Sequence, residues 1–316
     1  MSISLISGIL ENDTNSISKA ITLIENDKEI SDSFFNTLHE KSSKAIRIGI
    51  TGPPGAGKST LTNELIDTCL ANHLSVGVIA VDPTSPFSGG ALLGDRVRMN
   101  KYLWDNRVFI RSMGSHGDLG GLARKTQEAG DVLAASGKDI VFFETVGVGQ
   151  GEHDVIKTTD LTIVILVPES GDEIQLMKAG LIEIADLFVI NKSDREGANR
   201  LSSLLKNILH TFSVRKEIEP PVFNTIANQS EGVVELYLGI QNQINTMKEM
   251  GLFDKRRLNR YRNRVSDLIR ERLETKFWTK ENKIFLDQTT LSLTAIKSAP
   301  IMIAKQLLEG SSHESI

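Results

Sequence analysis

The segment from Gly52 to Thr60 constrains the fold more than any other part of the chain. It has the sequence Gly52-Pro53-Pro54-Gly55-Ala56-Gly57-Lys58-Ser59-Thr60, which is the G-x-x-x-x-G-K-[ST] spacing of a phosphate-binding loop. An apolar run, 46–51, precedes it and a helical pattern, 61–70, follows it. Glycines let successive backbone N–H groups point into one concavity, at the positive end of the following helix. The sequence therefore predicts strand, phosphate loop and helix in succession.

Two side chains of this loop have expected roles in binding a nucleoside triphosphate. Lys58 is placed to reach the β- and γ-phosphates, and the hydroxyl of Ser59 is placed to bind Mg²⁺. Lys58 is therefore our first catalytic candidate.

The remainder of the central segment alternates short apolar runs with helical patterns. The predicted strands are 46–51, 76–81, 108–113, 140–143, 161–167, 187–190 and 222–227. The predicted helices are 58–71, 121–136, 172–185, 196–210 and 231–248. Continuous apolar strands separated by helices are typical of a mostly parallel sheet that helices cover on both faces. We expect an α/β fold of the P-loop NTPase class, with ligands at the carboxyl ends of the strands.

Composition limits the other possibilities. The net charge of −4 over 316 residues argues against nucleic-acid binding through bulk charge. A single cysteine, Cys69, excludes a disulfide within the chain and favours a reducing compartment, the cytoplasm. No basic stretch followed by an apolar core opens the sequence, so no signal peptide is expected. No run of about 18 apolar residues is present, so we expect no membrane association.

Three regions are expected along the chain. Residues 1–45 look helical and form an N-terminal helical arm, 46–248 form the nucleotide-binding domain, and 249–316 form a C-terminal helical arm. In the last region arginines alternate with acidic residues along a helical pattern. Such a helix can bind RNA or a membrane, but interleaved acidic residues favour a helix in a protein interface, here a dimer.

Asn191-Lys192-Ser193-Asp194 follows a predicted strand directly and predicts a guanine pocket. The Asp194 carboxylate can accept from the ring N–H and the exocyclic amine of guanine together, a match that adenine does not offer. Lys192 can lie across the base, and Asn191 can join this loop to the phosphate loop. A backbone N–H in the turn Ile226-Ala227-Asn228 can bond the guanine carbonyl. The nucleotide is therefore expected to be GTP or GDP.

Three carboxylates near predicted strand ends are candidate Mg²⁺ contacts, direct or through water: Asp82, Asp95 and Glu144. For Asp82 and Asp95 a turn and a helix cap explain the pattern equally well. Glu144 ends an apolar strand and Gly147 follows it, which is typical of a loop that senses the γ-phosphate. His116 lies in a glycine-rich loop, and a lone histidine is weak evidence for a metal site. Lys178 follows an acidic helix start and has no local explanation.

With these motifs in hand, the chain resembles the MeaB/ArgK (methylmalonic aciduria type A) group of P-loop GTPases over about residues 15–310. The resemblance rests on segments 51–60, 81–87, 89–96, 144–150, 171–175 and 191–194. Two positions depart from the family pattern. Ile226 stands where a serine is usual before Ala227, and Gly151 stands where a serine is usual.

The resemblance implies a homodimeric GTPase that attends adenosylcobalamin-dependent methylmalonyl-CoA mutase, gating cofactor delivery and protecting the enzyme. It implies that Lys58 and Ser59 hold phosphate and Mg²⁺, with Asp82, Asp95 and Glu144 as metal-side carboxylates of two switch loops. Gln175 and Lys178 would belong to a third switch that responds to the partner. Glu144, as a metal-side carboxylate, and Lys178, in this third switch, are therefore further catalytic candidates. Asp194 would select guanine.

Three alternatives remain at this stage. One is a GTPase that delivers nickel in hydrogenase or urease maturation, although such proteins usually carry Cys/His metal motifs. The second is an ArgK-like transport-associated ATPase or kinase, which Asn191-Lys192-Ser193-Asp194 disfavours. The third is an interaction protein with a degenerate nucleotide site, which the intact Lys58 and Ser59 disfavour.

Overall fold

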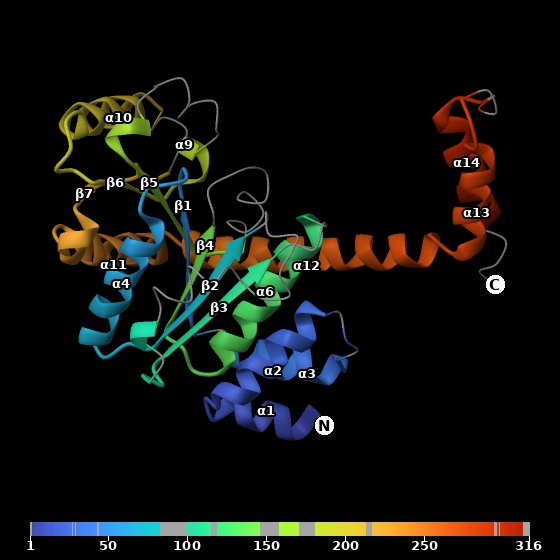
Figure 1. The fold of residues 1–316 in the computed structure, drawn as a ribbon, viewed down its shortest axis with the longest axis horizontal. Coiled ribbons are helices and arrows are strands. Elements are labelled where there is room, and N and C mark those ends of the chain that lie inside the picture. The colour runs from blue at the N-terminus through green and yellow to red at the C-terminus, as the bar shows by residue number, and fades with distance from the viewer. Residues whose placement is uncertain are drawn as a thin grey trace. The chain divides into compact units, whose positions relative to one another are not determined.

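A parallel sheet forms the centre of the fold (Figure 1). The computed structural model describes residues 2–26, 28, 30–42, 44–82, 100–102, 104–114, 119–145, 158–170, 181–212, 217–293, 296 and 298–311. Within these ranges seven strands pair in the order β3-β2-β4-β1-β5-β6-β7, and every neighbouring pair is parallel. The predicted α/β architecture is confirmed.

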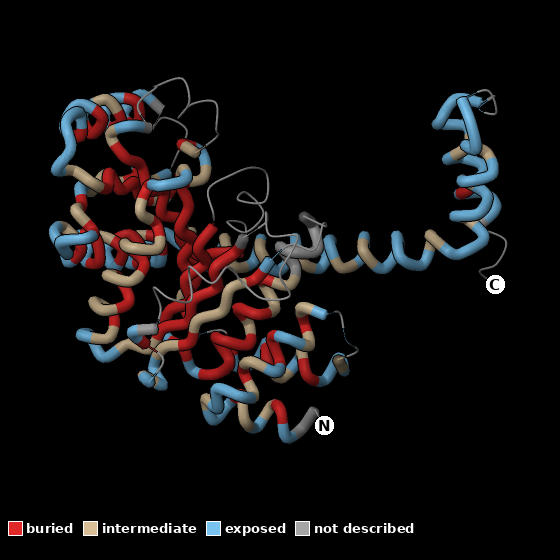
Figure 2. The backbone as a smooth tube through the Cα atoms, in the orientation of Figure 1, coloured by how far each residue is buried: buried red, intermediate tan, exposed pale blue. Residues whose placement is uncertain are grey.

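The strands coincide closely with the apolar runs of the sequence. They are β1 Ile46–Thr51, β2 Val76–Asp82, β3 Val108–Gly114, β4 Ile140–Thr145, β5 Leu161–Leu166, β6 Leu187–Asn191 and β7 Val222–Thr225. Every residue of β4, β5 and β6 is buried, as the central red strands of Figure 2 show. Burial on both faces explains why these strands are continuously apolar rather than alternating.

Helices cover both faces of the sheet, and alternate strand residues divide between the two sides. On one face, Phe142 of β4 packs in a cluster with α4 (Lys58–Ala71) and α11 (Val233–Glu249). On the other, Phe143 packs in a cluster with α6 (Leu119–Ala135), and Leu166 of β5 packs with α10 (Ala198–Phe212) and the short α9 (Leu181–Ile184). Short 3-10 helices η1 (Asn100–Tyr102), η2 (Pro168–Ser170) and η4 (Ala227–Gln229) lie in the connections.

The N-terminal helices α1 (Ser2–Leu10), α2 (Thr14–Glu25) and α3 (Asp32–Ser42) share the cluster of α6. Polar contacts add to this packing. Glu25 pairs with Arg111 of β3, and the Lys138 ammonium donates to Asn12 Oδ1 and Asn106 O, both at 2.9 Å. Burial lowers the pKa of Lys138 to about 8. These helices therefore complete one side of the sheet.

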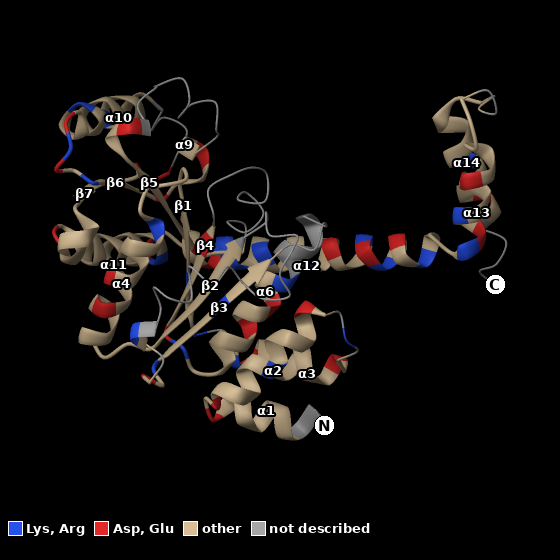
Figure 3. Cartoon of the chain, in the orientation of Figure 1, with Lys and Arg blue, Asp and Glu red and all other residues tan. Residues whose placement is uncertain are grey.

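Contacts divide the chain into two units, Met1–Asp254 and Lys255–Ile316, and the boundary falls inside α12 (Leu252–Phe277). The second unit continues with α13 (Lys280–Thr289) and α14 (Pro300–Ser311). Figure 3 shows basic and acidic residues interleaved along α12. The division into 1–45, 46–248 and 249–316 stays a proposal.

Candidate functional site

The predicted binding residues lie at the carboxyl edge of the sheet. β1 pairs with β4 on one side and β5 on the other, and Ile50 is in register with Glu144. β1 is where strand order reverses, since β2 to β4 lie to one side of it and β5 to β7 to the other. In open α/β sheets the crevice at such a switch point, outside the carboxyl ends, is where ligands bind.

The phosphate loop, 52–57, joins β1 to α4. Gly52, Gly55 and Gly57 have φ of 145°, 75° and 86°, a region that glycine enters without strain. A Cβ on Gly52 would lie 2.1 Å from the carbonyl oxygen of Ile165, so β5 approaches the loop too closely for any side chain there. Helix α4 begins at Lys58 directly after Gly57, and its N-terminal N–H groups face the loop.

Lys58 folds back over this loop. Its ammonium donates to Gly52 O at 2.7 Å and to Pro53 O at 3.1 Å, and its side chain is buried. A buried lysine is stable only with partners for its charge, so these carbonyls hold the cation at the centre of the loop.

Ser59 and Glu144 meet although 85 positions separate them in the chain. The Ser59 hydroxyl donates to Glu144 Oε1 at 2.5 Å, and Glu144 is buried near the end of β4. Beneath them, Thr145 Oγ1 donates to Thr51 Oγ1 at 3.0 Å, which joins the ends of β4 and β1. A hydroxyl and a carboxylate side by side are the hard oxygen donors that Mg²⁺ prefers, so the donor set fits this ion.

Asn191 lies between the phosphate loop and the end of β7. It is 2% exposed, and its Nδ2 donates to Ala56 O at 2.9 Å. Its Oδ1 accepts from the Thr225 hydroxyl and from the Ala227 N–H, both at 3.1 Å. Sequence reasoning did not select Thr225, because a threonine that ends a short strand has no distinguishing pattern.

The loop that follows Asn191 has three further attachments. Lys192, at φ 56°, donates from Nζ to Gly55 O at 2.8 Å. The Ser193 N–H donates to Thr225 O at 3.1 Å. Arg195 pairs with Glu169, and that hydrogen bond is the main cause that holds the pKa of Glu169 below its ordinary value. Asp194 is exposed, so its carboxylate is accessible to a nucleotide base.

Some predicted residues cannot be placed in this geometry. Asp95, Gln175 and Lys178 lie outside the described residues, as do the loop residues His116 and Gly147. For Asp82 the backbone is described as the last residue of β2, at the same edge as Glu144.

The described ranges contain no group of three or more His, Cys, Asp and Glu residues arranged to hold a metal ion. No helix in them is both long enough and apolar enough to cross a membrane.

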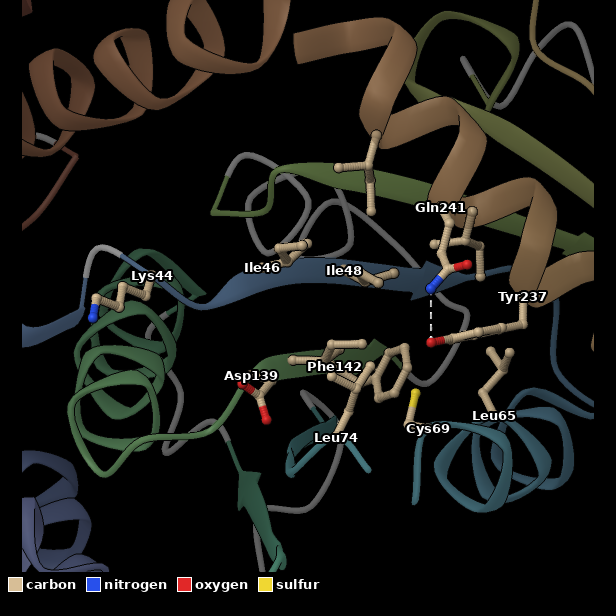
Figure 4. A pocket seen from close by; sticks show the side chains of 13 residues that line it. Lys44, Ile46, Ile48, Leu65, Cys69, Leu74, Asp139, Phe142, Tyr237 and Gln241 are labelled. Atoms are coloured by element: carbon tan, nitrogen blue, oxygen red, sulfur yellow. Dashed lines mark hydrogen bonds between the residues drawn. The ribbon is translucent and has the colours of Figure 1, made fainter. Parts of the chain in front are cut away.

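A separate apolar cavity of about 240 Å³ lies between α4, α11 and the sheet (Figure 4). Its walls include Ile48 and Phe142 of the strands, Cys69 of α4 and Tyr237 of α11. Ile46, the first residue of β1, also lines it, so it lies toward the amino ends of the strands, away from the phosphate loop. Burial, with a smaller contribution from the charge of Asp139, raises the pKa of Cys69 to about 12. The thiol is therefore protonated at neutral pH.

Known proteins resemble this chain over most of its length. Residues 17–282 match the family described as "Methylmalonyl Co-A mutase-associated GTPase MeaB". A protein of Pyrococcus abyssi is 42% identical over 313 residues, 97% of each chain. "Methylmalonic aciduria type A homolog, mitochondrial" of Mus musculus is 37% identical over 237 residues, 74% of this chain and 57% of the mouse protein.

Solved structures also have a similar fold, among them one that covers nearly the whole chain. It bears the name "Crystal structure of LAO/AO transport system kinase" and superposes with a TM-score of 0.73 at 24% identity, over 98% of this chain and 97% of that one. At this identity the likeness shows the fold alone.

The contact between Gly57 and Asn191 can be tested with a matched pair of glycines. A Cβ on Gly57 would lie 2.4 Å from Asn191 Nδ2, whereas a Cβ on Gly55 would meet nothing within 4 Å. Both positions have positive φ, so Gly57→Ala and Gly55→Ala each carry strain of about 1–3 kcal/mol. We expect the midpoint of thermal unfolding without nucleotide to fall further for Gly57→Ala.

Asn191→Ala serves as the second background for this measurement. Removing the carboxamide abolishes the extra loss at Gly57, so the two glycine variants become equivalent there. Equal midpoints for the two variants in the native background would contradict the close packing of Asn191 on the loop.

Proposed function

The chain belongs to the MeaB family of methylmalonyl-CoA mutase-associated GTPases and is itself a GTPase, and from this premise we propose that it serves an adenosylcobalamin-dependent mutase. It acts as a chaperone and gatekeeper, coupling its GTP or GDP state to loading of the cobalamin cofactor and protection of the enzyme. Methylmalonyl-CoA mutase is the proposed client, on the support of the family description and of the similar mouse protein.

The observation that carries the nucleotide assignment is the position of Asn191. Its carboxamide bonds the phosphate loop at Ala56 and, at Ala227, the turn 226–228, called here the base-side turn. A ligand with phosphates on the first and a purine on the second would span this contact. In the proposed pocket Asp194 accepts from the guanine N–H groups and a backbone N–H of 226–228 donates to the guanine carbonyl.

Hydrolysis in this proposal depends on positioning and charge rather than on a covalent intermediate. The loop N–H groups and Lys58 hold the β- and γ-phosphates. Ser59 and Glu144 would hold Mg²⁺, together with Asp82 and Asp95, and a bound ion would supply charge neutralisation at the phosphate oxygens. Lys178 is proposed to act from a segment that responds to the client, which would make hydrolysis partner-stimulated.

The second unit supports a proposed homodimer. Its helices carry large apolar side chains that are exposed in the single chain. On α12 they recur at helical spacing: Leu258, Tyr261, Val265, Ile269 and Leu273. On α13 and α14 they are Ile284, Phe285, Ile301, Met302 and Leu308. Exposed apolar patches of this extent mark interaction surfaces, and a second copy is the proposed partner. The proposed compartment is the cytoplasm, because a chain with one cysteine forms no disulfide within itself.

The guanine pocket predicts a defined change in base preference. Inosine nucleotides lack the exocyclic amine, so wild-type protein should bind GTP more tightly than ITP. In Asp194→Asn we expect that preference to shrink by roughly tenfold or more, because a charged acceptor for the amine is lost. Glu196→Gln, an exposed acid two positions on, is the matched control. If the ratio of GTP to ITP affinity in competition binding is the same for Asp194→Asn as for the wild type, the guanine pocket is refuted.

The client is tested with purified adenosylcobalamin-dependent methylmalonyl-CoA mutase. We expect its affinity for this chain to differ between GDP and a non-hydrolysable GTP analogue, and GTP turnover to rise when the mutase is added. Lys58→Ala, which loses the phosphate contact, should abolish both effects. Parallel titrations with ATP and with Ni²⁺ separate this function from a transport-associated ATPase and from metal delivery. Binding to the mutase that ignores the nucleotide, with no stimulation, would refute the proposal.

The dimer is tested by sedimentation. Wild-type protein should run at twice the chain mass of 34.8 kDa. The pair Ile269→Asp and Leu273→Asp places two charges on the apolar stripe of α12, so we expect monomers at micromolar concentration. Asn263→Asp adds a charge at an exposed polar position of the same helix and should leave the dimer intact. A monomeric wild-type chain would rule the dimer out.

A further inference from the structure

The turn that follows β7 is closed by its own backbone. Ile226 and Glu231 form an antiparallel bridge, with N–H to O distances of 3.0 and 3.3 Å. Within it, Gln229 N–H donates to Ile226 O at 2.9 Å and Ser230 N–H donates to Ala227 O at 3.3 Å. Ser230 has φ 59°, an uncommon conformation for a residue other than glycine. These residues include the proposed contact to the guanine carbonyl.

Two side-chain contacts hold this turn. The Ala227 N–H donates to Asn191 Oδ1 at 3.1 Å. The Ser230 hydroxyl donates to Glu64 Oε2 at 2.5 Å. Glu64 is the seventh residue of α4, so the second contact ties the turn to the helix that begins at Lys58.

Glu64 is a suitable anchor because its helix is itself fixed. The Tyr102 hydroxyl lies 2.9 Å from both Asn63 O and Asp67 Oδ1, and α4 contributes Leu61 and Leu65 to the main hydrophobic cluster. A hydroxyl that donates to an ionised carboxylate forms one of the stronger hydrogen bonds in proteins. The turn is therefore fixed against a rigid element.

We propose that Ser230 and Glu64 are positioning residues for guanine. They hold the 226–228 turn, in which the N–H groups of Ile226 and Ala227 already donate to Glu231 O and Asn191 Oδ1, so that the N–H of Asn228 donates to the carbonyl oxygen of the base. This inference rests on the proposed guanine pocket. Neither side chain is assigned a contact with the nucleotide. Their role is to fix the turn before the base arrives, so that binding does not have to order it.

The contact between Ser230 and Glu64 predicts a specific pattern of affinities for GDP, IDP and pyrophosphate. GDP and IDP both present a carbonyl at the position that the turn reads, so Ser230→Ala and Glu64→Ala should weaken both by the same factor, about threefold to tenfold. The GDP/IDP ratio should stay constant, because Asp194 reads the exocyclic amine. Pyrophosphate, which occupies the phosphate loop alone, should compete as it does with the wild-type chain.

The experiment measures dissociation constants by displacement of a fluorescent GDP analogue from the full chain, with the thermal midpoint recorded alongside. The double variant should lose no more affinity than either single variant, because one bond is removed in each case. Glu64→Gln keeps an acceptor oxygen and should recover most of the GDP affinity. Ser203→Ala and Glu235→Gln, at exposed helix positions, are the matched controls and should resemble the wild type.

The inference is overturned if the GDP affinity is unchanged in Ser230→Ala, or if the losses in the double variant are additive. It is also overturned if pyrophosphate binding falls as much as GDP binding, because that result would mean a general structural defect. If the wild-type chain binds GDP and ADP with equal affinity, the guanine pocket itself is refuted, and with it the proposed function.

Discussion

The carboxamide of Asn191 uses both of its ends inside the site. Its nitrogen donates to Ala56 O, and its oxygen accepts from Thr225 and from the Ala227 N–H. The side chain is buried, so a bond left unmade there would cost more than one at the surface. Gly57 is required beside it because a Cβ would lie 2.4 Å from the amide nitrogen. Phosphate loop, β6 and the base-side turn therefore keep one mutual arrangement.

The order of the strands makes this arrangement possible. β4, β1, β5, β6 and β7 are successive neighbours and parallel, so the loops that leave them emerge at one edge of the sheet. Ser59 meets Glu144 there, and α4 carries Glu64 toward Ser230. The site is thus a set of contacts between chain segments that are distant in sequence, held in place by a sheet that is buried on both faces.

Much of the fold could be predicted because its signals are local. The apolar run 46–51 became β1 with the same bounds, and glycine spacing marked the phosphate loop. Which face each strand residue covers could not be predicted, because Val141, Phe142 and Phe143 are all apolar and no alternation distinguishes them. Thr225, Glu64 and Ser230 went unselected for a related reason. They are common residue types in no motif, and only their partners give them a role.

The sequence by itself determined the chemistry at each loop: backbone N–H groups that can curl around phosphate, a lysine and a hydroxyl beside them, and an acid suited to guanine. These are properties of residue types at short spacing, so a linear pattern carries them. Only the tertiary structure decided that Ser59 faces Glu144, that the Asn191 carboxamide also reaches Thr225 and Ala227, and that Glu64 holds Ser230. Those pairs lie tens to more than a hundred positions apart, and strand order, which local periodicity does not encode, brings them together.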